Sequence, residues 1–126
     1  MNVVDSSAWL EYFADGPNAD TFAPPIQDTA LLIVPTLVIF EVFKRVLQQR
    51  SEGEALQAIA LLQQGRIIDL TDPLALSAAR ISVEHHLPMA DSIILATALA
   101  LDATLWTQDS DFEGIYGVRF IPKEGT

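Results

Sequence analysis

Four carboxylates that lie far apart along the chain have positions from which they could together bind a divalent cation. Asp5 ends a short apolar run at the N-terminus, and Asp109 follows a second apolar run near the C-terminus. Glu41 is embedded in the apolar segment 38–43, and Asp91 shares a helical face with apolar residues. A single buried carboxylate tends to protonate, and several together repel one another. A divalent cation relieves both effects, and oxygen ligands without histidine or cysteine nearby favour magnesium or manganese.

Each acid also has a simpler structural interpretation, which stays open at this point. Asp5 and Asp91 could cap the helices that follow them. Glu41 could pair with Lys44 or Arg45, three and four residues later, and Asp109 and Asp111 could form local turns within a loop. None of these interpretations explains why all four acids map to one edge of the expected fold.

The elements that must position these acids follow from the apolar periodicity. We expect strands over residues 2–5, 31–34, 66–70, 104–107 and 117–121, and helices over 6–13, 36–50, 53–64, 72–86 and 91–101. Ser6 or Ser7 is expected to cap the first helix and Thr36 the second, whereas residues 17–28, with two adjacent prolines, are ambiguous. Such alternation predicts an α/β fold: one domain over residues 1–126, with a parallel sheet covered by helices on both faces. In open sheets of this kind, functional groups gather beyond the carboxyl ends of the strands.

Composition limits the kind of protein and its partners. The chain has 126 residues, half of them apolar, and no cysteine, so we expect a soluble, cytoplasmic domain without disulfides or thiolate metal sites. The N-terminus lacks the basic start of a signal peptide, and no apolar run is long enough to span a membrane. The formal net charge of −10 opposes general binding to nucleic acid and favours binding of cations or of a basic partner.

Four segments carry a resemblance to a known family. They are residues 3–7 (VVDSS), 41–42 (EV), 87–98 (LPMADSIILATA) and 105–112 (LWTQDSDF). In order and spacing they resemble the PIN domain family, and within it the VapC-type toxins of bacterial toxin–antitoxin pairs. The first segment alone is weakly specific, whereas the last two together are fairly specific.

The resemblance implies a three-layer α/β/α sandwich with a central, mostly parallel sheet of four to five strands. It also implies endoribonuclease activity with Mg²⁺ or Mn²⁺, a homodimer, and inhibition by a cognate antitoxin. The family's acidic positions carry over to Asp5, Glu41, Asp91 and Asp109, its supporting hydroxyls to Ser6 and Thr107, and a frequent fifth acid to Asp111.

The mechanism that we expect is metal-assisted hydrolysis of RNA, with Asp5 as a central ligand because the first strand should lie in mid-sheet. Glu41 could be a further ligand or could position the attacking water. Lys44, Arg45 and Arg50 are candidate contacts to the RNA backbone or, equally, a solvated helix face, and a basic C-terminal segment of an antitoxin could enter the carboxylate pocket.

The main alternative is a catalytically silent binding or regulatory module of the same fold, which would be expected to have lost one of the acids. A phosphatase with an Asp-x-Asp nucleophile is disfavoured because Asp5-Ser6-Ser7 stands at that place.

Overall fold

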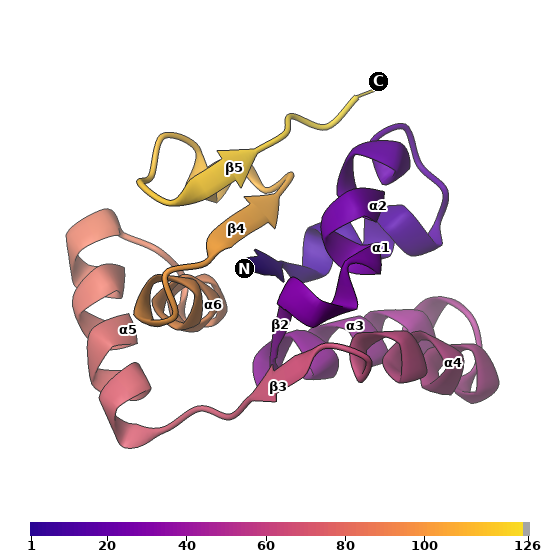
Figure 1. Cartoon of the computed structure of the whole chain (residues 1–126), viewed down its shortest axis with the longest axis horizontal. Helices are drawn as coiled ribbons and strands as arrows, with labels where there is room; N and C mark the ends of the chain where they lie inside the picture. Colours follow the sequence, from indigo (N-terminus) through magenta and orange to yellow (C-terminus); the bar gives the residue numbers. More distant parts are fainter. Residues whose placement is uncertain (125–126) are drawn as a thin grey trace.

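Short strands and longer helices alternate along residues 1–124, the part of the chain that this computed structural model describes (Figure 1). The strands are β1 (Asn2–Val4), β2 (Leu32–Pro35), β3 (Arg66–Ile68), β4 (Thr104–Thr107) and β5 (Val118–Phe120). The helices are α1 (Ser6–Phe13), α2 (Ala19–Gln27), α3 (Thr36–Gln49), α4 (Glu52–Leu62), α5 (Asp72–His85) and α6 (Met89–Ala100), with short 3-10 helices η1 (Thr29–Leu31) and η2 (Ser110–Phe112). No helix in the described residues is both long enough and apolar enough to cross a membrane.

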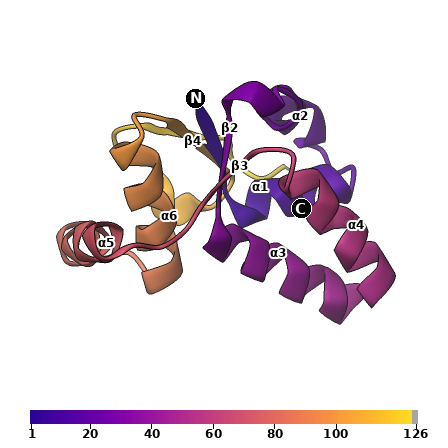
Figure 2. The same ribbon diagram turned by 60° about the horizontal axis from the view of Figure 1, so that its bottom comes forward.

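The five strands form one parallel sheet in the order β3-β2-β1-β4-β5. The chain first moves outward from β1 through β2 to β3 and then returns to β4 on the other side of β1. Right-handed crossovers that run in opposite directions along a sheet lie on opposite faces. Figure 2 accordingly shows α5 and α6 on one side of the strands and α1 to α4 on the other. The predicted α/β/α arrangement with a parallel sheet and a central first strand is confirmed.

The core fixes the central strand from both sides. Val3 and Val4 point to opposite faces of β1, and neither is exposed. They belong to a continuous cluster that includes Trp9 of α1 and Leu95 of α6. Burying a side chain of this size stabilises the fold by about 1.5–3 kcal/mol. This packing holds β1 in place and so fixes the position of Asp5, the residue that follows it.

Helix α2 occupies the stretch that the sequence pattern leaves ambiguous. Pro24 and Pro25 lie inside it and cannot donate to the carbonyls four residues earlier, so two helical hydrogen bonds are missing. Phe22, Pro25 and Ile26 are nevertheless buried against the core. Tertiary packing here outweighs the low helix propensity of proline.

Three helix starts differ from the sequence expectations. Asp5, rather than Ser6 or Ser7, caps α1, because its carboxylate accepts a hydrogen bond from the backbone of the third residue on. Pro35 precedes α3, so Thr36 is the first helical residue and not the cap. Helix α6 begins at Met89, two residues before the expected start, which places Asp91 in its first turn.

The carboxyl ends of β1 and β4 meet at one edge of the sheet. Val4 is paired with Trp106, and the backbone N–H of Asp5 donates to the carbonyl of Trp106 at 3.0 Å. Asp5 and Thr107 consequently lie side by side, although they are far apart in the sequence. This edge is where the candidate site is built.

Candidate metal centre

Asp5 is the most deeply held of the acids. It is 3% exposed, and its carboxylate accepts hydrogen bonds from Ser7 Oγ (2.6 Å), the backbone N–H of Ala8 (3.1 Å) and Thr107 Oγ1 (2.7 Å). Burial raises its pKa from 3.8 to about 6, and the charge of Asp109 adds to this, although the three hydrogen bonds lower the pKa. Asp5 therefore combines the capping role with a fixed orientation toward the other acids.

Thr107 links two of the acids through one hydroxyl. Its Oγ1 donates to Asp5 and accepts the backbone N–H of Asp109 at 2.9 Å. Asp109 in turn accepts the backbone N–H of Asp111 at 2.9 Å, which is the local turn that its sequence allows. The end of β4 thus holds Asp109 close to Asp5, and the short helix η2 brings Asp111 close to Asp109.

Asp91, Asp109 and Asp111 form a carboxylate cluster. One oxygen from each lies within 4.8 Å of the others, with Asp91 and Asp109 half-buried and Asp111 exposed. The pKa of Asp91 is raised from 3.8 to about 7, first by burial and then by the charges of Asp109, Asp5, Asp111 and Glu41. The negative charges of the other four acids therefore all act on Asp91.

Glu41 reaches this group from α3. Ser6 Oγ, in the first turn of α1, donates to Glu41 Oε1 at 2.9 Å. The carboxylate of Glu41 is half-buried and contributes to the raised pKa of Asp91. Ser6 thus supports Glu41, whereas Thr107 supports Asp5 and Asp109.

The donor set fits a hard divalent cation. Among the described residues, the one ion pair joins Arg50 to Glu54, so no lysine or arginine there neutralises the clustered carboxylates. A half-buried group of like charges without a counter-ion is costly. Oxygen-only ligands suit magnesium or manganese.

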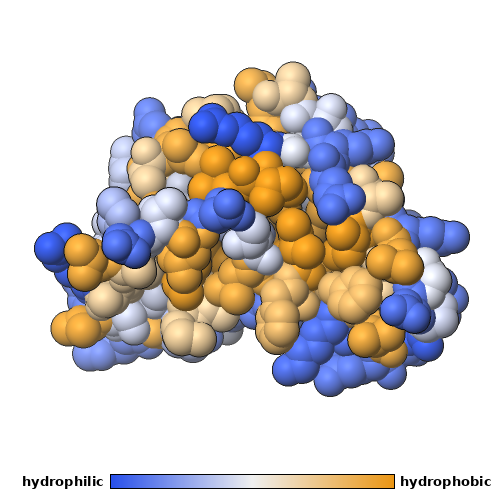
Figure 3. Space-filling view, turned by 90° about the horizontal axis from the view of Figure 1, so that it is seen from below, coloured by the Kyte–Doolittle hydropathy of each residue, from blue (hydrophilic) through white to orange (hydrophobic). Residues whose placement is uncertain are grey.

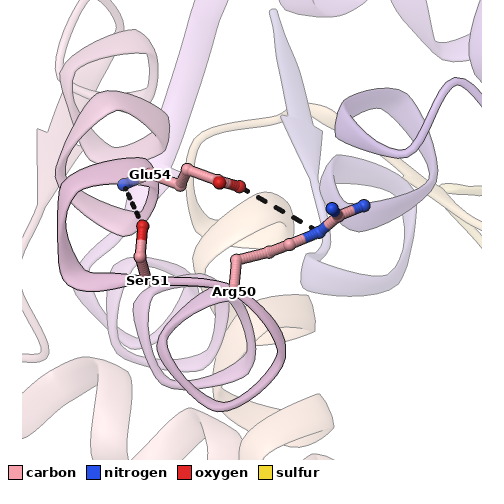
Figure 4. A network of polar contacts seen from close by, with 3 residues as sticks. All are labelled: Arg50, Ser51 and Glu54. Atoms are coloured by element: carbon pink, nitrogen blue, oxygen red, sulfur yellow. Dashed lines mark hydrogen bonds and ion pairs between the residues drawn. The ribbon is translucent and has the colours of Figure 1, made fainter.

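Two of the three candidate RNA contacts, Arg50 and Lys44, have local partners, and Figure 4 shows that of Arg50. Arg50 Nε lies 4.0 Å from Glu54 Oε2, and both side chains are more than half exposed. Ser51 accepts the backbone N–H of Glu54 at 3.1 Å and caps α4. Lys44 and Arg45 are exposed on α3, with Lys44 Nζ 5.7 Å from the ring centre of Phe40. The basic residues are therefore accessible but are not organised into one pocket.

Sequence reasoning missed a buried amide pair beside the acids. Asn18 Nδ2, at the start of α2, donates to Gln108 Oε1 (3.1 Å) and to the carbonyl of Pro122 (3.0 Å). Gln108 also contacts Ser7, whose hydroxyl Oγ lies 3.4 Å from the Gln108 backbone nitrogen. The two amides are joined by a hydrogen bond between residues that lie 90 positions apart in the sequence, and no local sequence pattern indicates such a bond. Ser7 was expected as a cap, but its position two residues after Asp5 is the signal for its hydrogen bond to that carboxylate.

Comparisons with known proteins agree with this architecture. A family model described as the PIN domain matches residues 3–118. No curated protein matches the chain.

Solved structures of toxin–antitoxin proteins share the fold. A toxin–antitoxin complex from Klebsiella pneumoniae aligns with a TM-score of 0.80 and 23% identity, covering 94% of this chain and 96% of that one. VapC20 of Mycobacterium tuberculosis, described as a toxin that cleaves the sarcin–ricin loop, aligns with a TM-score of 0.76 and 17% identity over 92% and 95% of the two chains. VapBC2 from Rickettsia felis, bound to a DNA fragment from its promoter, gives a TM-score of 0.74 and 14% identity over 98% of each chain. At these identities the likeness is one of fold, and because the family model spans most of the sequence, the chain belongs to the PIN domain family.

Proposed function

We propose that this protein is a divalent-metal-dependent endoribonuclease. The observation that carries the proposal is the cluster of Asp91, Asp109 and Asp111, with Asp5 and Glu41 close enough to perturb it. An uncompensated carboxylate group at the carboxyl edge of a parallel sheet is suited to binding a cation that in turn binds a phosphodiester. The likeness to a toxin described as cleaving the sarcin–ricin loop supports RNA as the substrate.

Each acid has a distinct part in this proposal. Asp5, Asp91 and Asp109 would hold the ion, and Glu41 would either complete its ligands or orient the attacking water. When bound, the ion supplies a Lewis acid that activates water and neutralises charge on the phosphate. Asp111 is exposed beside the cluster and would contact the ion or the waters around it.

The direct test is cleavage of RNA by the purified chain. Labelled tRNA and mRNA are incubated with magnesium, with manganese and with a chelator, and a DNA of the same sequence serves as the substrate control. We expect internal cuts in RNA only when a divalent ion is present. Equal cleavage in chelator would overturn the proposal.

Thr107→Val should weaken metal binding without unfolding the chain. Valine keeps the shape of threonine but removes the hydroxyl that orients both Asp5 and Asp109. Loss of such a supporting hydrogen bond typically costs about 10–100-fold in metal affinity or activity. Isothermal titration calorimetry with Mn²⁺ measures the affinity, and circular dichroism checks the fold. Thr107→Ser retains the hydroxyl and should stay within a fewfold of wild type; equal affinities for the valine and serine variants would contradict this role.

The double variant Lys44→Gln, Arg45→Gln tests the proposed contacts to the RNA backbone. Both side chains are exposed on α3, the helix that carries Glu41. If they bind phosphates, KM should rise, kcat should stay unchanged, and the slope of log affinity against log salt should fall by about one to two. Arg80→Gln on α5 is a control for the removal of a positive charge. Unchanged KM and salt slope in the double variant would assign these residues to a solvated face.

We also propose that the chain is the toxin of a type II toxin–antitoxin pair and forms a homodimer. The net charge of −10 and the uncompensated acids suit a basic antitoxin segment, whose lysines or arginines would replace the cation. Figure 3 shows a broad apolar area on the face seen from below, and large apolar side chains are exposed on α3, α4, β3 and α5 (Phe40, Leu47, Leu56, Ile67, Leu76 and Val83). Such surface suits protein partners.

A small adjacent gene whose product binds this chain and stops cleavage would test the pairing, and light scattering would test the dimer.

The second candidate is a catalytically silent module of the same fold. It predicts binding without cleavage under all metal conditions. None of the four acids that the family resemblance implies is missing from this chain, which favours the nuclease instead.

A further inference from the structure

A cavity of about 310 Å³ opens directly beside the candidate metal centre. Its lining consists of Gln108, Asp109, Ser110, Phe120, Pro122 and Lys123. Asp109 belongs to both the cavity and the carboxylate cluster, so anything bound in the cavity lies next to the acids. The other five lining residues are neither candidate metal ligands nor proposed basic contacts to RNA, so the proposed function gives them no role.

We propose that this cavity is a subsite that binds one nucleotide of the RNA next to the bond to be cleaved. The base would lie against Phe120 and Pro122, and Lys123 would contact the backbone phosphate. This inference rests on the proposed nuclease function, because it names a binding position for that substrate. It adds residues from β5 and the segment after it to a site otherwise built from β1, α3, α6 and β4.

The size and lining of the cavity suit a single base. Ligand pockets usually begin at about 300 Å³, so this one has room for one nucleotide and not for a longer stretch. Phe120 is half-buried at the end of β5, where it is paired with Thr107, and Pro122 adds a second apolar surface. Aromatic rings stack on any base, which suits a subsite on a single strand. The exposed Ser110 adds a hydroxyl to the lining.

Buried hydrogen bonds hold the cavity in shape. Asn18, only 4% exposed, donates to Gln108 Oε1 and to the carbonyl of Pro122, and so ties the segment after β5 to the end of β4. The backbone N–H of Ile121 donates to the carbonyl of Thr107 at 2.8 Å. Gln108, whose side-chain oxygen accepts from Asn18, is one of the residues that line the cavity. A preformed pocket loses less entropy when it binds a flexible strand.

Charge distinguishes RNA from an acidic peptide as the occupant. Lys123 is the one cationic side chain in the lining, which it shares with Asp109, in a protein of net charge −10. A nucleotide offers a single phosphate for Lys123 and a neutral base for the apolar wall. A peptide rich in carboxylates would place further negative charge against the acids.

The test is direct binding, measured by NMR on the ¹⁵N-labelled full chain without a divalent ion. The probes are the four nucleoside 5′-monophosphates, with ribose 5-phosphate as the control that lacks a base. We expect the amides of Ser110, Phe120 and Lys123 to shift with at least one nucleotide and much less with ribose 5-phosphate. Equal shifts with ribose 5-phosphate, or shifts confined to other surfaces, would overturn the proposal.

Two variants separate the base contact from the phosphate contact. Phe120→Leu should weaken nucleotide binding roughly fivefold to tenfold, because it removes stacking. Lys123→Gln, at an exposed position that will not unfold the chain, should weaken nucleotide binding severalfold and lower its salt slope by about one. Arg66→Gln on β3, at the opposite edge of the sheet, is the control for loss of positive charge and should bind as wild type does. Wild-type affinity in Lys123→Gln would exclude the phosphate contact.

Failure of this inference and failure of the nuclease proposal look different. If nucleotides bind at the cavity but RNA is never cut, the subsite stands and the nuclease proposal fails. If RNA is cut with a divalent ion but Lys123→Gln and Phe120→Leu leave KM unchanged, the nuclease stands and the subsite fails. If both are correct, the two variants raise KM for RNA severalfold and change kcat little.

Discussion

Asp5→Asn should remove RNA cleavage while the chain stays folded. The substitution keeps the volume of the side chain and retains an oxygen that can accept from Ser7 and from the backbone of Ala8. It removes the negative charge from the acid that lies deepest in the site, at 3% exposure. We expect a loss of at least about 10²- to 10³-fold, the size seen when one electrostatic contact to a reacting group is removed. The measurement is the initial rate of cleavage of a labelled RNA with magnesium, beside the melting temperature of the same preparation.

The matched control is Asp102→Asn. Asp102 is exposed just before β4, at the end of the sheet opposite the carboxyl ends of the strands, and its φ of 53° is a backbone conformation that asparagine tolerates well. The control makes the same change in net charge and should cleave RNA at the wild-type rate. If Asp5→Asn with added magnesium or manganese keeps the rate of Asp102→Asn, the central role of Asp5 is wrong.

The location of the acids could be predicted from the sequence because the carboxyl ends of parallel strands converge. Asp5 and Asp109 follow apolar runs short enough to be strands, and the pairing of β1 with β4 brings their ends together. The alternation of strands and helices likewise predicts the parallel sheet and its covered faces. Both predictions depend only on the apolar pattern within single segments of the sequence.

Details that depend on distant partners could not be predicted in the same way. The bonds of Asn18 to Gln108 and Pro122 join residues that no local pattern relates. Helix α2 forms despite Pro24 and Pro25, because burial of its apolar side offsets the missing hydrogen bonds. The sequence also leaves open whether an acid caps a helix or lies with other acids; Asp5 caps α1, and the charge of Asp109 contributes to its raised pKa.

Magnesium should stabilise the protein strongly at about pH 8 and only slightly at about pH 5. Asp5 has its pKa raised by burial from 3.8 to about 6, and Asp91 to about 7 by burial and by neighbouring acids. A carboxyl whose pKa is higher in the folded state than in the unfolded chain favours folding when it is protonated. That contribution is complete below about pH 4 and is lost as the pH rises through about 6 to 7. Above this range the metal-free protein bears the unrelieved repulsion of its ionised acids.

A bound cation reverses the balance because it binds only the ionised carboxylates, with which protons compete at low pH. At about a hundredfold excess over its Kd, the ion adds about 2.7 kcal/mol, or roughly 10 °C in melting temperature for a chain of this size. Scanning calorimetry at both pH values, with and without magnesium, measures the difference. Asp91→Asn should raise the metal-free melting temperature at about pH 8 and shrink the magnesium shift, whereas Asp102→Asn, with the same net charge, should do neither. An equal magnesium shift at both pH values would mean that the ion is not bound by these acids, since their protonation would then leave its affinity unchanged.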